Sequence, residues 1–209
     1  MKFIAGRTCL DFVNTVGGRV SNVYTGAQHD YADTIVREKL GDYGDLLAWA
    51  EAAGAVEKQE IRILSSAADC QPAEASAVFA RSIALREALY RIFKAAIEGS
   101  PVREPDLEIL RREWSSAAAN ETLVHFAGKL SRVWNAHGSA LDRILWPVAR
   151  SAVDLLTSPE VVRVRQCGGY ECGWLFLDTS RNHGRRWCDM KDCGNRAKVR
   201  RFRQRQRRD

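Results

Sequence analysis

Four cysteines near the end of the chain stand in two pairs with identical spacing. Four residues separate Cys167 from Cys172, four separate Cys188 from Cys193, and fifteen lie between the pairs. Two short loops can bring four thiolates around one ion, and structural Zn²⁺ prefers this tetrahedral set. A disulfide would need an oxidising compartment, and His183 is the alternative fourth ligand. The spacing therefore predicts one structural Zn²⁺ per chain, with a coordination shell that four cysteines complete.

The residues that follow Cys193 form a strongly basic run. Residues 196–208 hold eight Lys or Arg side chains and no acid, and seven of the eight are Arg. Guanidinium groups make bidentate contacts with phosphate and guanine, so a helix here would suit nucleic acid. Val199 and Phe202 form a narrow apolar strip that we expect to dock on the zinc module; the alternative is a solvated tail. The candidate nucleic-acid contacts are Arg185, Arg186, Arg196, Lys198, Arg200, Arg201, Arg203 and Arg207.

A small module must position these groups. The first cysteine pair is typical of a knuckle, residues 174–178 are predicted as a strand, and residues 185–188 as a strand that returns to pair with it. A helix then begins at Cys193. Knuckle, hairpin and helix in this order are the treble-clef layout. A module of about fifty residues with few apolar side chains needs a metal for stability.

The rest of the chain differs in charge and in periodicity. Residues 1–159 hold 18 basic and 20 acidic side chains, whereas residues 160–209 hold 14 and 6, which places a boundary near Ser158. Apolar residues recur at helical spacing through most of the first part, and Pro147 should kink the last helix. Alternating segments at 121–126 and 130–135 favour a β-hairpin. The expected helices are 8–15, 42–53, 57–68, 72–97, 106–119 and 139–156, whereas no element is assigned within 21–41. The predicted fold class is mainly α with a small β-hairpin (α+β) and a C-terminal treble-clef-like zinc finger.

No group of residues in the chain predicts catalysis. His29, His125 and His137 stand alone, and no nucleophile–base pair, carboxylate pair or phosphate loop is visible. No stretch approaches the roughly 18 apolar residues of a membrane span, and the first ten residues lack the apolar core of a signal peptide. We therefore expect a cytoplasmic protein that is not an enzyme and does not enter a membrane.

Two polar residues lie on the otherwise apolar first helix. Asp11 and Asn14 either point into a ligand pocket or hydrogen-bond to a neighbouring turn. Cys9 on the same helix, and Cys70, are typical of small apolar core residues. Asp11 and Asn14 are therefore the candidate pocket residues outside the finger.

The finger resembles a known family. Residues 193–196 read CGNR, residues 173–182 read GWLFLDTSRN and residues 185–188 read RRWC. With both cysteine pairs, these motifs are similar to the CGNR zinc-finger proteins, bacterial proteins described as stress-induced transcription regulators. Residues 9–15, CLDFVNT, resemble the start of that family's N-terminal ABATE domain. The resemblance implies an α-rich domain of its own fold over residues 1–158 and a DNA-binding zinc finger over residues 159–209.

The favoured hypothesis is a DNA-binding transcription regulator. The finger and its Arg-rich helix would contact DNA, and the N-terminal domain would sense a signal or form a homodimer. The sequence identifies no small-molecule effector. An RNA-binding protein is the first alternative, because zinc knuckles and Arg-rich segments also bind RNA. A zinc-stabilised protein-interaction module is the second.

Overall fold

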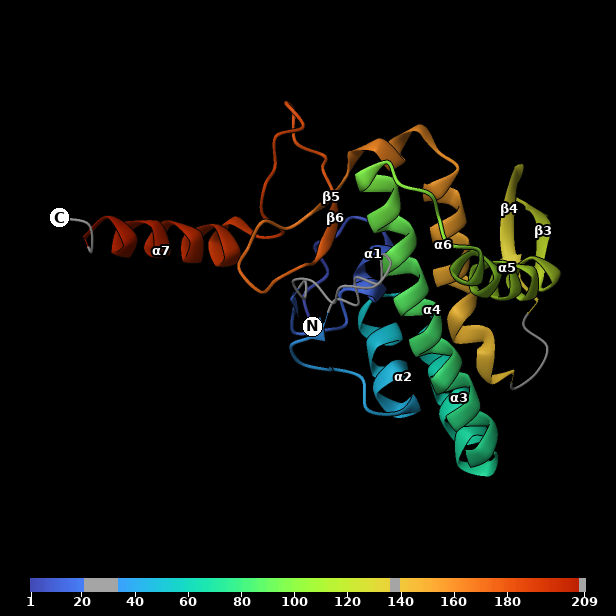
Figure 1. Ribbon diagram of the computed structural model, residues 1–209. Helices are drawn as coiled ribbons and strands as arrows, with labels where there is room; N and C mark the ends of the chain where they lie inside the picture. The colour runs from blue at the N-terminus through green and yellow to red at the C-terminus, as the bar shows by residue number, and fades with distance from the viewer. Residues whose placement is uncertain (21–33, 136–139, 207–209) are drawn as a thin grey trace.

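The long helix α4 (Pro72–Glu98) forms the centre of the N-terminal part of the molecule (Figure 1). The computed structural model describes residues 1–20, 34–135 and 140–206. Val78, Leu85 and Leu89 are buried at helical spacing along α4, and proline occupies its first turn, where no N–H is needed. Gly99 ends the helix in the left-handed conformation, with φ of 66°. The helix predicted over residues 72–97 is confirmed.

Four further α-helices of the described part of the chain pack against α4. These are α1 (Thr8–Val13), α2 (Tyr43–Ala52), α3 (Lys58–Cys70) and α5 (Glu104–Ala119). The Asp42 side chain accepts a hydrogen bond from the Asp45 N–H at the start of α2, and Glu57 and Glu60 form a capping box at the start of α3. Such acceptors satisfy N–H groups that have no partner within the helix. All four helices agree with the predicted ones to within a few residues.

The predicted β-hairpin is also confirmed. Strands β3 (Glu121–Phe126) and β4 (Lys129–Trp134) pair antiparallel, with Glu121 opposite Trp134 and Phe126 opposite Lys129. At the base of the hairpin, the Trp134 ring packs 5.7 Å from the Trp146 ring. The rest of the hairpin projects from the helices (Figure 1) and exposes large apolar side chains, namely Leu123, Phe126 and Leu130.

The segment expected as one kinked helix is two helices. The 3₁₀ helix η1 (Leu141–Leu145) is followed directly by the α-helix α6 (Trp146–Leu156). Pro147 lies in the first turn of α6, where its missing N–H breaks no hydrogen bond. The predicted kink at Pro147 is therefore wrong, because proline begins a helix here.

The predicted hairpin within the finger is wrong in its pairing. Strand β6 (Leu175–Leu177) pairs antiparallel with β5 (Val164–Gln166), which precedes the first cysteine, and residues 185–188 form no strand. The other edge of β6 is occupied, because the Leu177 N–H donates to the Ala5 carbonyl at 2.8 Å. With both edges paired, β6 offers no edge to residues 185–188. This part of the treble-clef expectation is wrong, whereas its final helix, α7 (Asn195–Gln206), is present after a π-helical turn, η3 (Met190–Gly194).

The two parts of the chain share one hydrophobic core. Helix α1 contacts both α6 and β6, and α4 contacts β5. Phe12, Leu89 and Leu175 belong to one buried cluster that also contains the four clustered cysteines. A short strand pair, β1 (Arg19–Val20) with β2 (Thr34–Ile35), lies beside it, and η2 (Pro159–Arg163) follows α6. Among the residues described, no helix is long and apolar enough to cross a membrane.

Candidate metal centre and nucleic-acid interface

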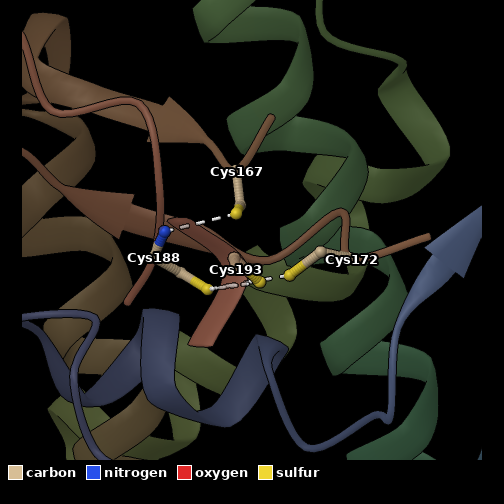
Figure 2. A group of neighbouring side chains, drawn as sticks. All are labelled: Cys167, Cys172, Cys188 and Cys193. Atoms are coloured by element: carbon tan, nitrogen blue, oxygen red, sulfur yellow. Dashed lines mark hydrogen bonds between the residues drawn. The ribbon is translucent and has the colours of Figure 1, made fainter. Parts of the chain in front are cut away.

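The two cysteine pairs meet at one point in the structure (Figure 2). The Sγ atoms of Cys167, Cys172, Cys188 and Cys193 all lie within 4.8 Å of one another, and all four residues are buried. The Sγ of Cys188 lies 3.7 Å from that of Cys172 and 3.6 Å from that of Cys193. A tetrahedron with Zn–S bonds of about 2.3 Å has edges of about 3.8 Å. The four free thiols therefore fit a tetrahedral Zn²⁺.

The loop between the first two ligands passes close to the sulfurs. A Cβ on Gly169 would lie 3.0 Å from the Sγ of Cys193 and 3.1 Å from the Cβ of Cys172, so a side chain here would crowd the ligands. The backbone N–H groups of Gly169 and Cys188 donate to the Sγ of Cys167 at 3.4 and 3.2 Å. The Arg196 guanidinium donates to the Sγ of Cys193 at 3.5 Å. These donors offset the negative charge that four thiolates leave around a divalent ion.

The thiols of the cysteine cluster shift one another's pKa values strongly. The pKa of Cys167 is lowered, because the neighbouring Cys172 and Cys188 thiols and the backbone N–H groups of Cys188 and Gly169 stabilise its thiolate. The pKa values of Cys172 and Cys188 are raised, because a thiolate at Cys167 disfavours a second negative charge beside it and because both thiols are buried. Further thiolates in this cluster need a compensating cation, which a divalent metal would supply.

The donor set defines the role of the metal. Four cysteine ligands leave no open coordination position, so the site is a structural zinc site and offers no place for a substrate. Zn²⁺ would cross-link the knuckle after β5, the segment at Cys188 and the turn η3. Because α7 continues directly from η3, the metal would fix the start of that helix.

The polar residues of α1 position the finger. The Asp11 carboxylate accepts hydrogen bonds from the N–H groups of Ile4 and Ala5, both at 3.0 Å. The Asn14 amide donates to the Leu175 carbonyl at 2.7 Å and accepts from the Leu175 N–H at 2.9 Å. Asn14 thus takes the place of a neighbouring strand at the edge of β6. These hydrogen bonds match the second alternative, in which Asp11 and Asn14 bond to neighbouring backbone. They correct the expectation that the two residues form a ligand pocket.

A second contact joins the zinc knuckle to β1. The Arg19 N–H donates to the Cys172 carbonyl at 3.1 Å. Gly173 has φ of 60°, and a Cβ there would lie 2.7 Å from the Cβ of Arg19. The Trp174 indole N–H donates to the Val16 carbonyl at 3.0 Å. The knuckle therefore rests directly on the segment that follows α1.

Both parts joined by these contacts match known families. A family model described as "CGNR zinc finger" matches residues 163–206, which include all four cysteines. The ABATE family model, described as "Putative stress-induced transcription regulator", matches residues 6–159, most of the chain. The chain belongs to the ABATE family. No curated protein matches it closely enough to indicate a relationship. Below, the ABATE region is residues 6–159 and the CGNR finger is residues 163–206.

Helix α7 projects from the CGNR finger as an arm (Figure 1). None of its described residues is buried, and Val199 and Phe202 are 49% and 62% exposed. The expectation that these two residues dock on the finger is wrong, because the apolar side of the finger packs on the ABATE region instead. Arg207 lies outside the described residues. Six basic side chains of α7 are exposed: Arg196, Lys198, Arg200, Arg201, Arg203 and Arg205.

The two arginines before Cys188 have different roles. The Arg185 guanidinium donates to the carbonyls of Trp187 and Cys188, and it lies 4.4 Å from the centroid of the Phe176 ring. These contacts hold Arg185 within the CGNR finger. The expectation that it contacts nucleic acid is therefore corrected, and Arg185 is no longer a candidate. Arg186 is exposed, with its guanidinium 5.6 Å from the centroid of the Trp187 ring, and remains a candidate.

The remaining sequence candidates do not belong to the four-cysteine cluster. His183 is exposed with φ of 47° and does not belong to the sulfur group, and His125 is exposed on β3. His29 and His137 fall outside the described residues. Cys9 is buried as expected, and burial raises its pKa to about 12. Cys70 is exposed at the end of α3, so the expectation that it is a core residue is wrong.

Two cations that no sequence signal marked face the CGNR finger. Arg37 and Lys39 follow β2, within the segment to which no element was assigned. With residues of the knuckle and of α7, they line an open cleft of about 1230 Å³. The pairing of this segment with residues 16–18 brings them there, and such a long-range contact has no local signature in the sequence.

Proposed function

We propose that the protein is a DNA-binding transcription regulator in which the zinc-bound CGNR finger presents α7 to duplex DNA. The observation that carries the proposal is the exposed, purely basic surface of α7. It has six exposed basic side chains, no acid and no buried residue among those described, and it begins directly after the turn that contains Cys193. The family description, which names a transcription regulator, supports the same function.

The dimensions and chemistry of α7 suit the major groove. Twelve helical residues extend about 18 Å, and an α-helix fits the width of that groove. Arginine can contact phosphate oxygens whatever the DNA sequence is, and it can contact the edge of guanine where the recognised sequence contains that base. Zn²⁺ would contribute no chemistry beyond fixing the direction from which the helix leaves the finger.

The ABATE region is proposed to supply oligomerisation or signal sensing. The projecting hairpin β3–β4 supports oligomerisation, because Leu123, Phe126 and Leu130 are 66%, 82% and 72% exposed. Large exposed apolar groups of this kind mark interaction surfaces. Sedimentation of the wild type and of a Phe126→Ser, Leu130→Ser variant tests the homodimer. A monomeric wild type at micromolar concentration would contradict this part of the proposal.

The role of α7 is tested by the salt dependence of DNA binding. Each phosphate neutralised contributes about 0.9 to the slope of log affinity against log salt. The variant Arg200→Gln, Arg201→Gln, Arg203→Gln should therefore flatten the slope by about 2 to 3 on a labelled duplex of mixed sequence. Titrations followed by fluorescence anisotropy at several salt concentrations measure the slope.

The matched control removes three exposed cations far from α7. Lys58 and Arg62 lie on α3 and Lys129 on the hairpin, on the opposite side of the molecule from α7 in Figure 1. Their triple substitution by Gln changes net charge equally and should leave the slope nearly unchanged. Equal effects of the two triples would reject a role for α7. Tighter binding to single-stranded RNA than to duplex DNA at matched salt would favour the RNA alternative.

A further inference from the structure

An open cleft separates α7 from the ABATE region. One wall consists of Val36, Arg37 and Lys39, and the other consists of the side of α7 that carries Arg200 and Arg201. The zinc knuckle forms the floor. The cleft volume of about 1230 Å³ exceeds that of most small-molecule sites, and its length along α7 suits an extended ligand.

The wall on the ABATE region has a defined position. The Gly17 N–H donates to the Arg37 carbonyl at 2.6 Å, and the Val36 N–H donates to the Gly18 carbonyl at 2.9 Å. Between the two cations, the Glu38 carboxylate turns to Arg86 of α4, which lies 2.6 Å away and is completely buried. Arg37 and Lys39 therefore face the cleft from a backbone that is anchored on both sides.

The charges that line the cleft are unbalanced. Six basic side chains line it, against the two carboxylates of Glu171 and Asp192 and the net charge of about −2 that four thiolates leave on a zinc site. Asp192 is already paired, with Arg196 at 2.9 Å and with Lys2 at 3.3 Å. Within the described part of the chain, no carboxylate lies within ion-pair distance of the other four cations, which are Arg37, Lys39, Arg200 and Arg201. Such a surface is complementary to a polyanion.

Aromatic side chains in and beside the zinc knuckle contact one cation of each wall. Lys39 Nζ lies 4.6 Å from the centroid of the Trp174 ring, which the hydrogen bond to Val16 fixes beside the knuckle. Across the cleft, the Arg200 guanidinium lies 4.0 Å from the centroid of the Tyr170 ring, in the loop between the first two ligands.

We propose that Arg37 and Lys39 form a second phosphate-binding wall, so that the backbone of DNA lies in the cleft between the ABATE region and α7. The inference rests on the proposed function and extends it, because it makes the ABATE region part of the DNA interface. It names two contacts that the finger alone does not supply. Phosphate contacts of this kind fix the orientation of a protein on the duplex.

The test compares two charge-matched double variants of the full-length, zinc-loaded protein. Arg37→Gln with Lys39→Gln should flatten the salt slope on the labelled duplex by about 1.8, at about 0.9 per phosphate. Lys58→Gln with Arg62→Gln, on α3, should change it little. The charge-conserving variant Arg37→Lys with Lys39→Arg should restore the slope. An unchanged zinc content and circular dichroism spectrum show that each variant is folded.

A crosslinking measurement separates contact from long-range attraction. A photoreactive amino acid at Val36, which is 51% exposed in the cleft, should crosslink to the duplex. The same group at Ile63, which is 49% exposed on α3, should not. Equal crosslinking at the two positions would overturn the proposal.

The outcomes distinguish the inference from the function on which it rests. If the α7 triple variant loses binding while the Arg37 and Lys39 variant keeps the full slope, the second wall is wrong and the proposed function stands. If the wild type does not bind the duplex, both fail. If AMP or inorganic phosphate binds in a manner that needs Arg37 and Lys39 while the duplex slope is unaffected, the cleft is a small-anion site and the second wall is wrong.

Discussion

The ABATE region and the CGNR finger are stabilised by different means. The ABATE region buries apolar side chains along α4, α1 and α6, in the manner of an ordinary helical core. The CGNR finger contributes one short buried strand, β6, and a cluster of four sulfurs, and α7 beyond it buries nothing among its described residues. The first part can be stabilised by packing, whereas the second needs a metal or a neighbour.

The structure gives the finger a neighbour, the ABATE region, and a four-cysteine site that fits the metal. Its strand β6 is bound by Asn14 and its knuckle rests on Arg19, so docking and zinc act on adjacent segments. The docking contacts do not include η3 or the start of α7, which the metal would hold together with a surface ion pair between Lys2 and Asp192, at 3.3 Å. We infer that loss of the metal releases α7 completely, whereas loss of docking loosens the whole finger.

The largest expected effect is loss of the metal. Wild-type protein should contain about one zinc per chain. Cys172→Ser or Cys193→Ser should abolish most of the zinc binding, whose free energy is about 10–16 kcal/mol in zinc-finger peptides. Residues of η3 and α7 should become sensitive to protease, while the helical signal of the ABATE region persists. Cys70→Ser, at an exposed cysteine outside the cluster, is the control. A full zinc content in either ligand variant would contradict the assignment.

The next effect concerns docking at Asn14. Asn14→Ala leaves the buried N–H and carbonyl of Leu175 without partners, at a cost of about 1–3 kcal/mol each. We expect the free energy of unfolding in urea to fall by about 2–6 kcal/mol. Asn182→Ala, at an exposed position in the finger, should change it by less than about 0.5 kcal/mol. Equal stability of both variants would show that Asn14 does not hold β6.

The smallest expected effect is the difference in stability between two glycine variants, which measures the contact between the knuckle and β1. Gly173→Ala forces a left-handed residue to carry a Cβ and also overlaps Arg19. Gly99→Ala has a similar φ of 66° but no atom within 4 Å, so it pays the backbone cost alone, about 1–2 kcal/mol. Gly173→Ala should lower the free energy of unfolding by about 1–3 kcal/mol more than Gly99→Ala does. Identical unfolding midpoints would mean that the knuckle moves away from Arg19 freely.

The sequence predicts the local features of this molecule and misses those that depend on distant contacts. Helix α4, the hairpin β3–β4 and the cysteine pairs have periodicity or spacing that a single segment displays, and all are confirmed. Strand β6 was paired with the wrong segment because its true partners, β5 and Asn14, are chosen by the shared core. Arg37 and Lys39 carry no pattern at all; their place depends on the pairing of their backbone with residues 16–18.

The central claim, that the metal centre orients α7 for DNA, is tested most directly by duplex binding with and without zinc. A free helix of about twelve residues is marginal in water, so metal-free α7 should lose its structure as well as its direction. We predict that a chelator weakens binding to the labelled duplex by at least tenfold, about 1.4 kcal/mol, and that one equivalent of zinc restores it. Unchanged affinity and salt slope in the metal-free protein would contradict the account, because an unoriented basic tail would then suffice.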